Sequence, residues 1–147
     1  MKKLNRKGFT LIELLAVVVV LAIVLVVTIP SVLRSVGNAR TQSLENAANS
    51  VSDWLTRQYE LKELENTGVT TDTAYDGLPA TLGTSESPTT LNNALLIAAG
   101  FSGGTADATG TAWMSGNKIC VKLDPSTATA TNGGRFKGVE AKSSTGC

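Results

Sequence analysis

Hydrophobic and polar positions divide the chain into three stretches of different character. Residues 9–33 form a largely apolar run that contains one charged side chain, Glu13. In residues 34–66, apolar positions recur near the 3.6-residue period of an amphipathic helix. Residues 67–147 are rich in small and polar side chains, with short strand and turn patterns. The pattern therefore predicts an α+β protein, in which a long helix precedes a small antiparallel sheet that packs on its second half.

The first two stretches are expected to form one helix that begins at Phe9 and ends near Asn66. A helix over residues 9–33 would span roughly 37 Å, more than the bilayer core of about 30 Å. The whole helix, about 55 residues long, is much longer than the average helix of a globular protein. Gly68 is expected to cap it. After Pro30 the apolar stripe of the helix comprises Leu33, Val36, Leu44, Ala47, Ala48, Val51, Leu55 and Tyr59.

The third stretch contains one short helical pattern and several strand patterns. Residues 90–99 are expected to form a helix that Gly100 closes. Residues 118–123 alternate polar and apolar side chains, which is typical of a half-buried strand, and Asp124 and Pro125 should end it.

Two further strands are predicted around this central one. Trp113 and Met114 are expected to begin one of them. Residues 132–134, Asn-Gly-Gly, are a turn signal, and residues 135–141 are expected to form an antiparallel partner strand. Residues 126–134 are low in complexity and are interpreted as a mobile or sugar-bearing loop.

The first eight residues resemble no ordinary secretory signal. They carry Lys2, Lys3, Arg6 and Lys7 without an acid, so the N-terminus should stay on the cytoplasmic side. A secretory signal has an apolar region of about 7–15 residues, followed by a small-residue cleavage site. Here the small residue, Gly8, precedes the apolar run, so cleavage there would remove the charges and keep the helix.

Two residues are unusual within the apolar run. A carboxylate such as Glu13 costs roughly 2.5–3.5 kcal/mol in a membrane segment, so it usually has a partner or a function. The plainer alternative is a tolerated charge near the helix end that reaches the headgroups. Pro30 removes a backbone donor, and either kinks a plain membrane helix or breaks it.

Together, the basic leader, Gly8, Phe9, Glu13 and the apolar run resemble the N-terminus of type IV prepilins. The resemblance implies that prepilin peptidase cuts between Gly8 and Phe9 and methylates the new amine of Phe9. It implies that Glu13, fifth in the mature chain, pairs with the N-terminal amine of a neighbouring subunit. Pairing would offset the high cost of burying either charge alone.

Pro30 extends the resemblance, because many pilins carry proline at residue 22 of the mature chain. The membrane-bound monomer should still be helical there, since its backbone must bond to itself in lipid. In a packed filament a local helix break before Pro30 becomes possible. Ala22 stands where the family often has glycine, which leaves the extent of that break open.

Charge and composition exclude several other classes of function. The chain has a formal net charge of +1, but residues 9–147 carry 9 basic and 12 acidic side chains, a net −3. This balance gives no electrostatic footprint for nucleic acid, so we expect no specific nucleic-acid site. With no histidine, no glycine-rich phosphate loop and no metal-ligand cluster, we expect no enzyme, no cofactor and no metal site. Some pseudopilins bind calcium in a loop, but Asp72 and Asp76 do not have the spacing of a known calcium loop.

The two cysteines, Cys120 and Cys147, both lie in the part expected outside the cell. We expect a disulfide between them, which would stabilise the fold by about 3–4 kcal/mol. The alternative is two separate thiols. Residues 142–146 carry almost no apolar side chain, so we expect only the bond to hold this tail. Type IVa pilins resemble this arrangement, with a C-terminal cysteine pair bounding a loop.

The resemblance organises the whole chain into a leader at residues 1–8, a membrane or filament-core helix half at 9–33, an amphipathic half at 34–66 and a head domain at 67–147. It implies a precursor that crosses the cytoplasmic membrane once, N-terminus inside. Its expected partners are prepilin peptidase, the assembly machinery and other pilin subunits, in an extracellular filament for adhesion, motility or DNA uptake. The alternatives are a pseudopilin of a type II secretion or competence system and an uncleaved single-pass surface protein.

Overall fold

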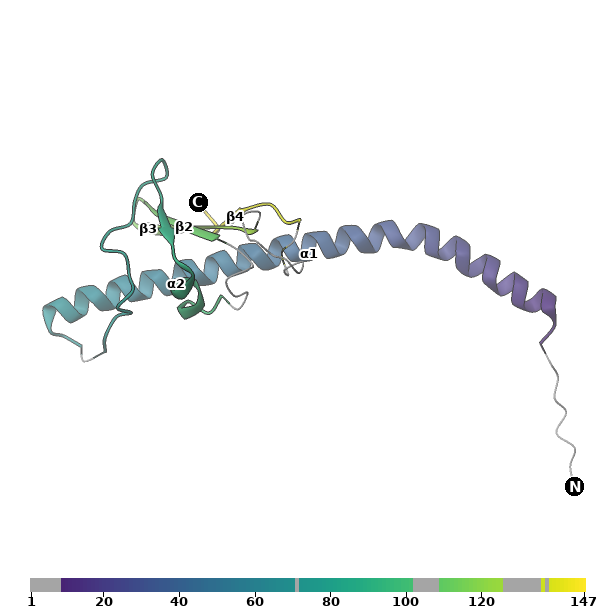
Figure 1. Ribbon diagram of the computed structural model, residues 1–147, viewed down its shortest axis with the longest axis horizontal. Coiled ribbons are helices and arrows are strands. Elements are labelled where there is room, and N and C mark those ends of the chain that lie inside the picture. Colours follow the sequence, from purple (N-terminus) through teal and green to yellow (C-terminus); the bar gives the residue numbers. More distant parts are fainter. Residues whose placement is uncertain (1–8, 71, 102–108, 126–135, 137) are drawn as a thin grey trace, which may run out of the picture. The chain divides into compact units, whose positions relative to one another are not determined.

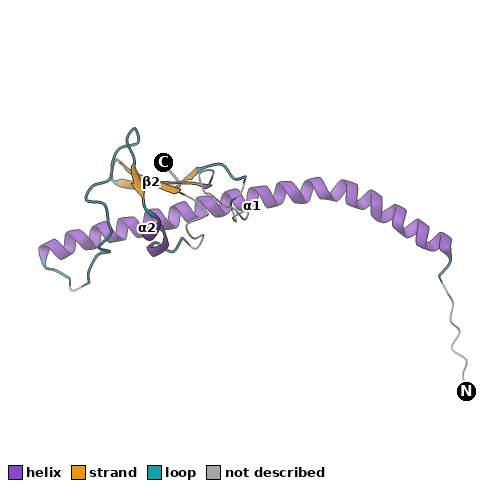
Figure 2. Cartoon of the chain, in the orientation of Figure 1, coloured by secondary structure: helices purple, strands orange, loops and turns teal. Residues whose placement is uncertain are grey.

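The computed structural model describes residues 9–70, 72–101, 109–125, 136 and 138–147. In chain order it contains the helix α1 (Leu11–Thr67), the strand β1 (Thr89–Leu91), the helix α2 (Asn93–Ala98) and the strands β2 (Thr109–Ser115), β3 (Lys118–Asp124) and β4 (Lys142–Ser143). Figure 2 colours these elements by type. A long helix with a small antiparallel sheet packed against it is an α+β architecture, consistent with the pilin fold, and confirms the predicted fold class.

The long helix α1 has 57 residues and includes Pro30. It ends at a glycine in the left-handed region: Gly68 has a φ of 70°, and the backbone N–H groups of Gly68 and Val69 donate to the carbonyls of Glu65 and Leu64. These bonds satisfy carbonyls that the last turn leaves without helical partners. The predicted helix and its glycine cap are therefore confirmed, with its start two residues later than expected.

The chain separates into two compact units, Met1–Gly37 and Asn38–Cys147. In the second unit, the four strands lie in the order β1-β2-β3-β4, and all neighbours are antiparallel. The hairpin β2–β3 is the centre of the sheet, and it pairs Trp113 with Cys120 and Ala112 with Val121. Figure 1 shows this hairpin beside the C-terminal part of α1.

The core of the second unit lies between α1 and the sheet. On the helix, Leu44, Ala48, Val51 and Leu55 follow the spacing of one face and are fully or almost fully buried. The strand β3 contributes Ile119, Val121 and Leu123, which alternate along the strand and therefore share a face. The short helix α2 closes the core with Leu95 and Leu96.

The connection from α1 to β1 folds back along the helix. The ring of Tyr75 contacts the ring of Trp54 edge-on, with centroids 5.6 Å apart, and its backbone N–H donates to the side-chain oxygen of Gln58. The Tyr59 hydroxyl donates to the carbonyl of Pro79 at 2.7 Å. These contacts hold the loop against the last turns of α1.

Two expectations for the third stretch need correction. Thr90 and Leu91, predicted as the start of a helix, pair with β2 instead, and the helix begins at Asn93. The side chain of Asn92 caps it by accepting from the N–H of Leu95, so the asparagine fixes the boundary. The predicted closure by Gly100 is confirmed, because its φ is 82° and its N–H donates to Ile97.

The partner of β3 is β4, Lys142–Ser143, and not residues 135–141. The described residues of that predicted strand, 136 and 138–141, are turn or irregular. Val139 is buried there, so its apolar character reflects packing on the core and not strand pairing. The strand predicted at 118–123 is confirmed as β3, and Trp113 and Met114 lie within β2. The loop at 126–134 and the turn at 132–134 lie outside the described residues.

Candidate functional site

The N-terminal end of α1 is closed by its own side chains. The backbone N–H and the hydroxyl of Thr10 both donate to the same carboxylate oxygen of Glu13, each at 2.9 Å, and the N–H of Glu13 donates to the Thr10 hydroxyl at 3.3 Å. This reciprocal arrangement is a capping box, which satisfies N–H groups at the helix start. Our reading of the sequence missed it, although the Thr-x-x-Glu spacing before an apolar run is its known signal.

Among the described residues, Glu13 is held in place by hydrogen bonds to Thr10 and not by an ion pair. Phe9, the residue before this cap, is 90% exposed. Gly8, the other residue of the predicted cleavage site, lies outside the described residues. Phe9 and Glu13 are four positions apart in the sequence, and this spacing alone places them near each other.

Every described residue of the first unit, 9–37, is exposed. From Leu11 to Leu33, large aliphatic side chains around the whole helix are about half exposed or more. By length and composition, α1 is the one helix among the described residues that is suited to cross a membrane. A contiguous apolar surface of this extent indicates a membrane or protein contact. The helix continues through Pro30, as expected for the monomer, and a break there in a filament stays a prediction.

The two cysteines form a disulfide, with 5.8 Å between their Cα atoms. Cys120 follows Ile119 on β3, so its side chain points to the face of the strand that is turned away from the α1 core. It is nonetheless fully buried. The C-terminal tail, residues 142–147, covers this face and accounts for three consecutive buried residues in a strand for which alternation was expected.

The expectation that only the disulfide holds this tail is wrong. Beside the two β4 pairs, the N–H of Ser144 donates to the carbonyl of Val121, and the hydroxyl of Ser144 accepts from the N–H of Val121. The Ser144 hydroxyl also lies 3.2 Å from the sulfur of Cys147. Ser144 is 3% exposed, so this buried polar residue, and not an apolar side chain, fixes the tail to β3.

A second clamp joins the tail to α1. The side chain of Asn49 accepts from the N–H of Thr145 at 2.6 Å and donates to the Thr145 hydroxyl at 3.0 Å. The ammonium group of Lys118 donates to the carbonyl of Thr145. Asn49 and Lys118 thus hold Thr145, which lies in the turn before Cys147. Nothing in the spacing of Asn49 and Thr145 along the sequence indicated the contact, because the two residues are 96 positions apart.

The acidic pair considered for calcium is not built as a metal centre. Asp72 and Asp76 are both exposed. Across the described ranges, no three histidine, cysteine, aspartate or glutamate side chains gather where they could hold a metal ion. The described residues thus provide two defined features, a capped carboxylate at the start of α1 and a buried disulfide.

Comparison with known proteins bears on the first of these sites. Residues 3–29 match the model of the prokaryotic N-terminal methylation motif. No curated protein and no solved structure matches the chain. The match covers most of the basic leader, Gly8, Phe9, Glu13 and most of the apolar run, and the motif is a substrate signal for prepilin peptidase. The chain therefore begins with a class III signal peptide of the kind found in type IV pilins, and this supports a pilin-like or pseudopilin-like precursor.

Proposed function

We propose that this chain is a structural subunit of a type IV pilus. The observation that carries the proposal is the methylation motif at residues 3–29, followed by an apolar helix with no buried residue in its first unit. Such a surface is unfavourable in water, and a bilayer or a bundle of identical helices would cover it. The disulfide near the C-terminus favours a pilus subunit over a pseudopilin, by resemblance to type IVa pilins.

The precursor would sit in the cytoplasmic membrane, with residues 1–8 inside the cell. Prepilin peptidase would cut between Gly8 and Phe9 and methylate the amine of Phe9. Residues 9–33 would pass from the bilayer into a filament core, where a break at Pro30 becomes possible. Residues 34–66 would carry the head, residues 67–147, on the filament surface.

In this scheme Glu13 would change its partner during assembly. The capping box gives its carboxylate two donors in the monomer. In a filament core, the methylated amine of a neighbouring subunit would bring a positive charge to the carboxylate. A buried pair of this kind is costly to break, by about 3–5 kcal/mol, because one charge is left uncompensated.

Mass spectrometry and electron microscopy of the same surface material test the proposal. Filaments whose subunits begin with methylated Phe9 are the expected result. Subunits that keep Met1 would instead indicate an uncleaved surface protein. Trimmed subunits in the membrane without surface filaments would favour a pseudopilin.

The variant Glu13→Gln separates the two contributions of this residue. Glutamine also suits the third helical position of a capping box, since its amide oxygen can accept from Thr10. It cannot pair as an anion with an ammonium group. We expect cleaved, membrane-inserted subunits and a large loss of filaments. Filament yield equal to that of the wild type would leave Glu13 with the capping role alone.

A further inference from the structure

A groove opens beside the last turns of α1, where the helix extends past the sheet. Its volume is about 570 Å³, and it lies within the second unit, between α1, residue 80 and the turn of the β2–β3 hairpin. A second hollow of about 340 Å³ adjoins it and shares Tyr59, Met114 and Ile119 with it. We call the two together the helix–hairpin groove.

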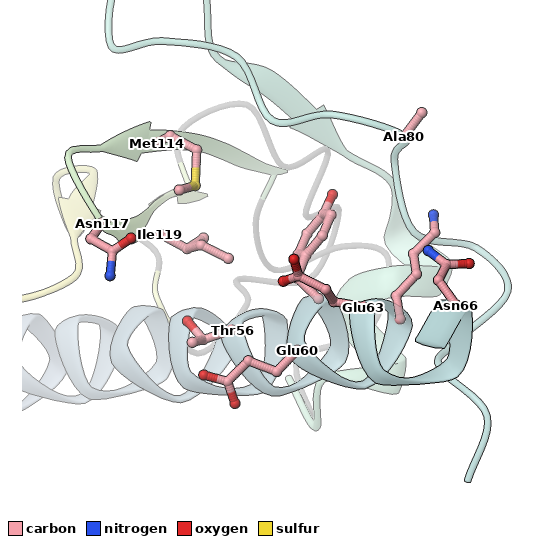
Figure 3. A pocket seen from close by; sticks show the side chains of 10 residues that line it. Thr56, Glu60, Glu63, Asn66, Ala80, Met114, Asn117 and Ile119 are labelled. Carbon is pink, nitrogen blue, oxygen red and sulfur yellow. The ribbon is translucent and has the colours of Figure 1, made fainter. Parts of the chain in front are cut away.

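The groove has an apolar floor and an acidic rim. The floor is formed by Ile119 and by Met114, whose side chain is 40% exposed. On the helix side the rim carries the carboxylates of Glu60 and Glu63 and a single cation, Lys62. Figure 3 shows Met114 and Ile119 on the hairpin side and the two glutamates on the helix side. The rim is therefore net negative.

Neither glutamate has a hydrogen-bonding partner for its carboxylate among the residues that the structure describes. Neither forms an ion pair within the described part of the chain. Glu63 lies one turn from the end of α1, where the helix dipole disfavours negative charge, and no basic residue occupies the last turn. A cation supplied from outside would remove this repulsion.

The same helix carries a surface of matching chemistry. Between Glu13 and Glu45 the charged residues are Arg34 and Arg40, with no acid. Arg40 is exposed and has no ion pair among the residues that the structure describes. Val36 is 43% exposed and precedes Arg40 by four residues, so the two share a helix face. One apolar side chain beside one cation fits an apolar floor with an acidic rim.

We propose that the helix–hairpin groove receives α1 of a second copy of this chain, with Val36 on the floor and Arg40 between Glu60 and Glu63. The proposal rests on the proposed function, since it requires copies that assemble. The groove and the segment around Arg40 are different surfaces of one chain, so the contact is head-to-tail. A contact of this kind extends to a third and fourth copy and produces an open filament, not a closed dimer.

A charge exchange tests the contact in full-length protein expressed as the only subunit. We expect Glu60→Lys with Glu63→Lys, and separately Arg40→Glu, each to lower the yield of sheared filaments about tenfold. The three changes together should restore it to within about twofold of the wild type. Asp53→Lys is the matched control, because Asp53 is exposed on the same helix and does not line the groove. Amounts of mature subunit in the membrane should be equal in all variants.

A photo-crosslinking amino acid in place of Met114 gives the direct readout. In wild-type-like filaments it should attach to the tryptic peptide of residues 35–40 from another copy. Filaments that form while the label attaches elsewhere, or a triple variant no better than its parents, would overturn the contact and leave the proposed function standing. Absence of any filament from the wild-type strain would overturn both.

Discussion

The first part of α1 is the more apolar in sequence, but only its second part contains buried residues. Up to Gly37 the helix is mostly apolar, yet none of its described residues is buried. From Asn38 onward it is amphipathic, and its apolar stripe is buried through Leu44, Ala48, Val51 and Leu55. Apolar character therefore does not by itself produce burial within one chain. The more apolar part needs an environment that the chain does not supply, and the less apolar part has a core of its own.

This difference has a thermodynamic consequence. Burial of apolar area stabilises a fold by roughly 25 cal/mol per Å², but only where water is removed. In the second unit the sheet removes water from the apolar stripe of α1, so truncating single side chains of this stripe should lower the stability of the head. In the first unit a bilayer or neighbouring helices would have to do so.

The largest effect is expected from truncating a core residue, and it tests the contrast directly. Leu55→Ala should lower the free energy of unfolding of the second unit by about 2–5 kcal/mol, because Leu55 is fully buried and leaves a cavity. Leu21→Ala makes the same chemical change in the first unit, where the side chain is exposed. Denaturant titration of both full-length variants in detergent should show the loss for Leu55 alone. Equal losses would show that the head depends on the apolar part.

A second prediction concerns the disulfide. Cys147→Ser should lower the free energy of unfolding by about 3–4 kcal/mol, since the bond closes a loop of 27 residues in the unfolded chain. The tail should nevertheless stay paired, because Ser144 and Thr145 keep their hydrogen bonds to β3 and α1. Hydrogen exchange of the Ser144 amide reports this directly. Full exchange at the rate of an unstructured peptide would mean that the bond alone holds the tail.

The sequence predicted the features that depend on local pattern. The extent of α1 follows from periodicity, its cap from the glycine at position 68, and the strand β3 from alternation over neighbouring residues. The N-terminal motif is local as well, and Gly8, Phe9 and Glu13 lie within the 3–29 match. The cleavage between Gly8 and Phe9 and the role of Glu13 in assembly stay predictions.

The features that sequence reasoning missed depend on contacts between distant residues or on competition between them. The pairing of Thr90 with Thr111 overrode a helical pattern, because β2 offers the strand a partner and the Asn92 cap delays the helix. Burial of Cys120 and Ser144 depends on the tail lying over β3. No period in the sequence encodes a contact between residues 96 positions apart, such as that of Asn49 with Thr145.

That clamp gives a third, smaller prediction. Asn49→Ala removes two hydrogen bonds to Thr145 and should lower the free energy of unfolding by about 1–2 kcal/mol. Asn46→Ala is the matched control on the same helix, because the Asn46 side chain is exposed. Alanine gains helix propensity equally at both positions, so the difference between the variants isolates the clamp. Equal unfolding free energies would show that the bonds to Thr145 add nothing beyond those to water.

The smallest expected effect lies at the far end of the core, at Tyr59. Tyr59→Phe removes the hydrogen bond to the Pro79 carbonyl and should lower the free energy of unfolding by about 0.5–1.5 kcal/mol near neutral pH.

Partial burial raises the pKa of the Tyr59 hydroxyl above its ordinary value, so the folded protein holds this proton more tightly than the unfolded chain. The contribution of the Tyr59 hydroxyl is therefore complete below a pH of about 10, the pKa at which an unfolded tyrosine is half ionised, and is lost as the pH rises through the raised pKa of the folded protein. Denaturant titrations between neutral pH and pH 11 should show the wild type losing more stability than Tyr59→Phe. Tyr75→Phe serves as the control for removing a phenol while keeping the ring contact with Trp54. If the wild type and Tyr59→Phe lose stability in parallel with rising pH, the loop that contains Pro79 is not held by the neutral phenol.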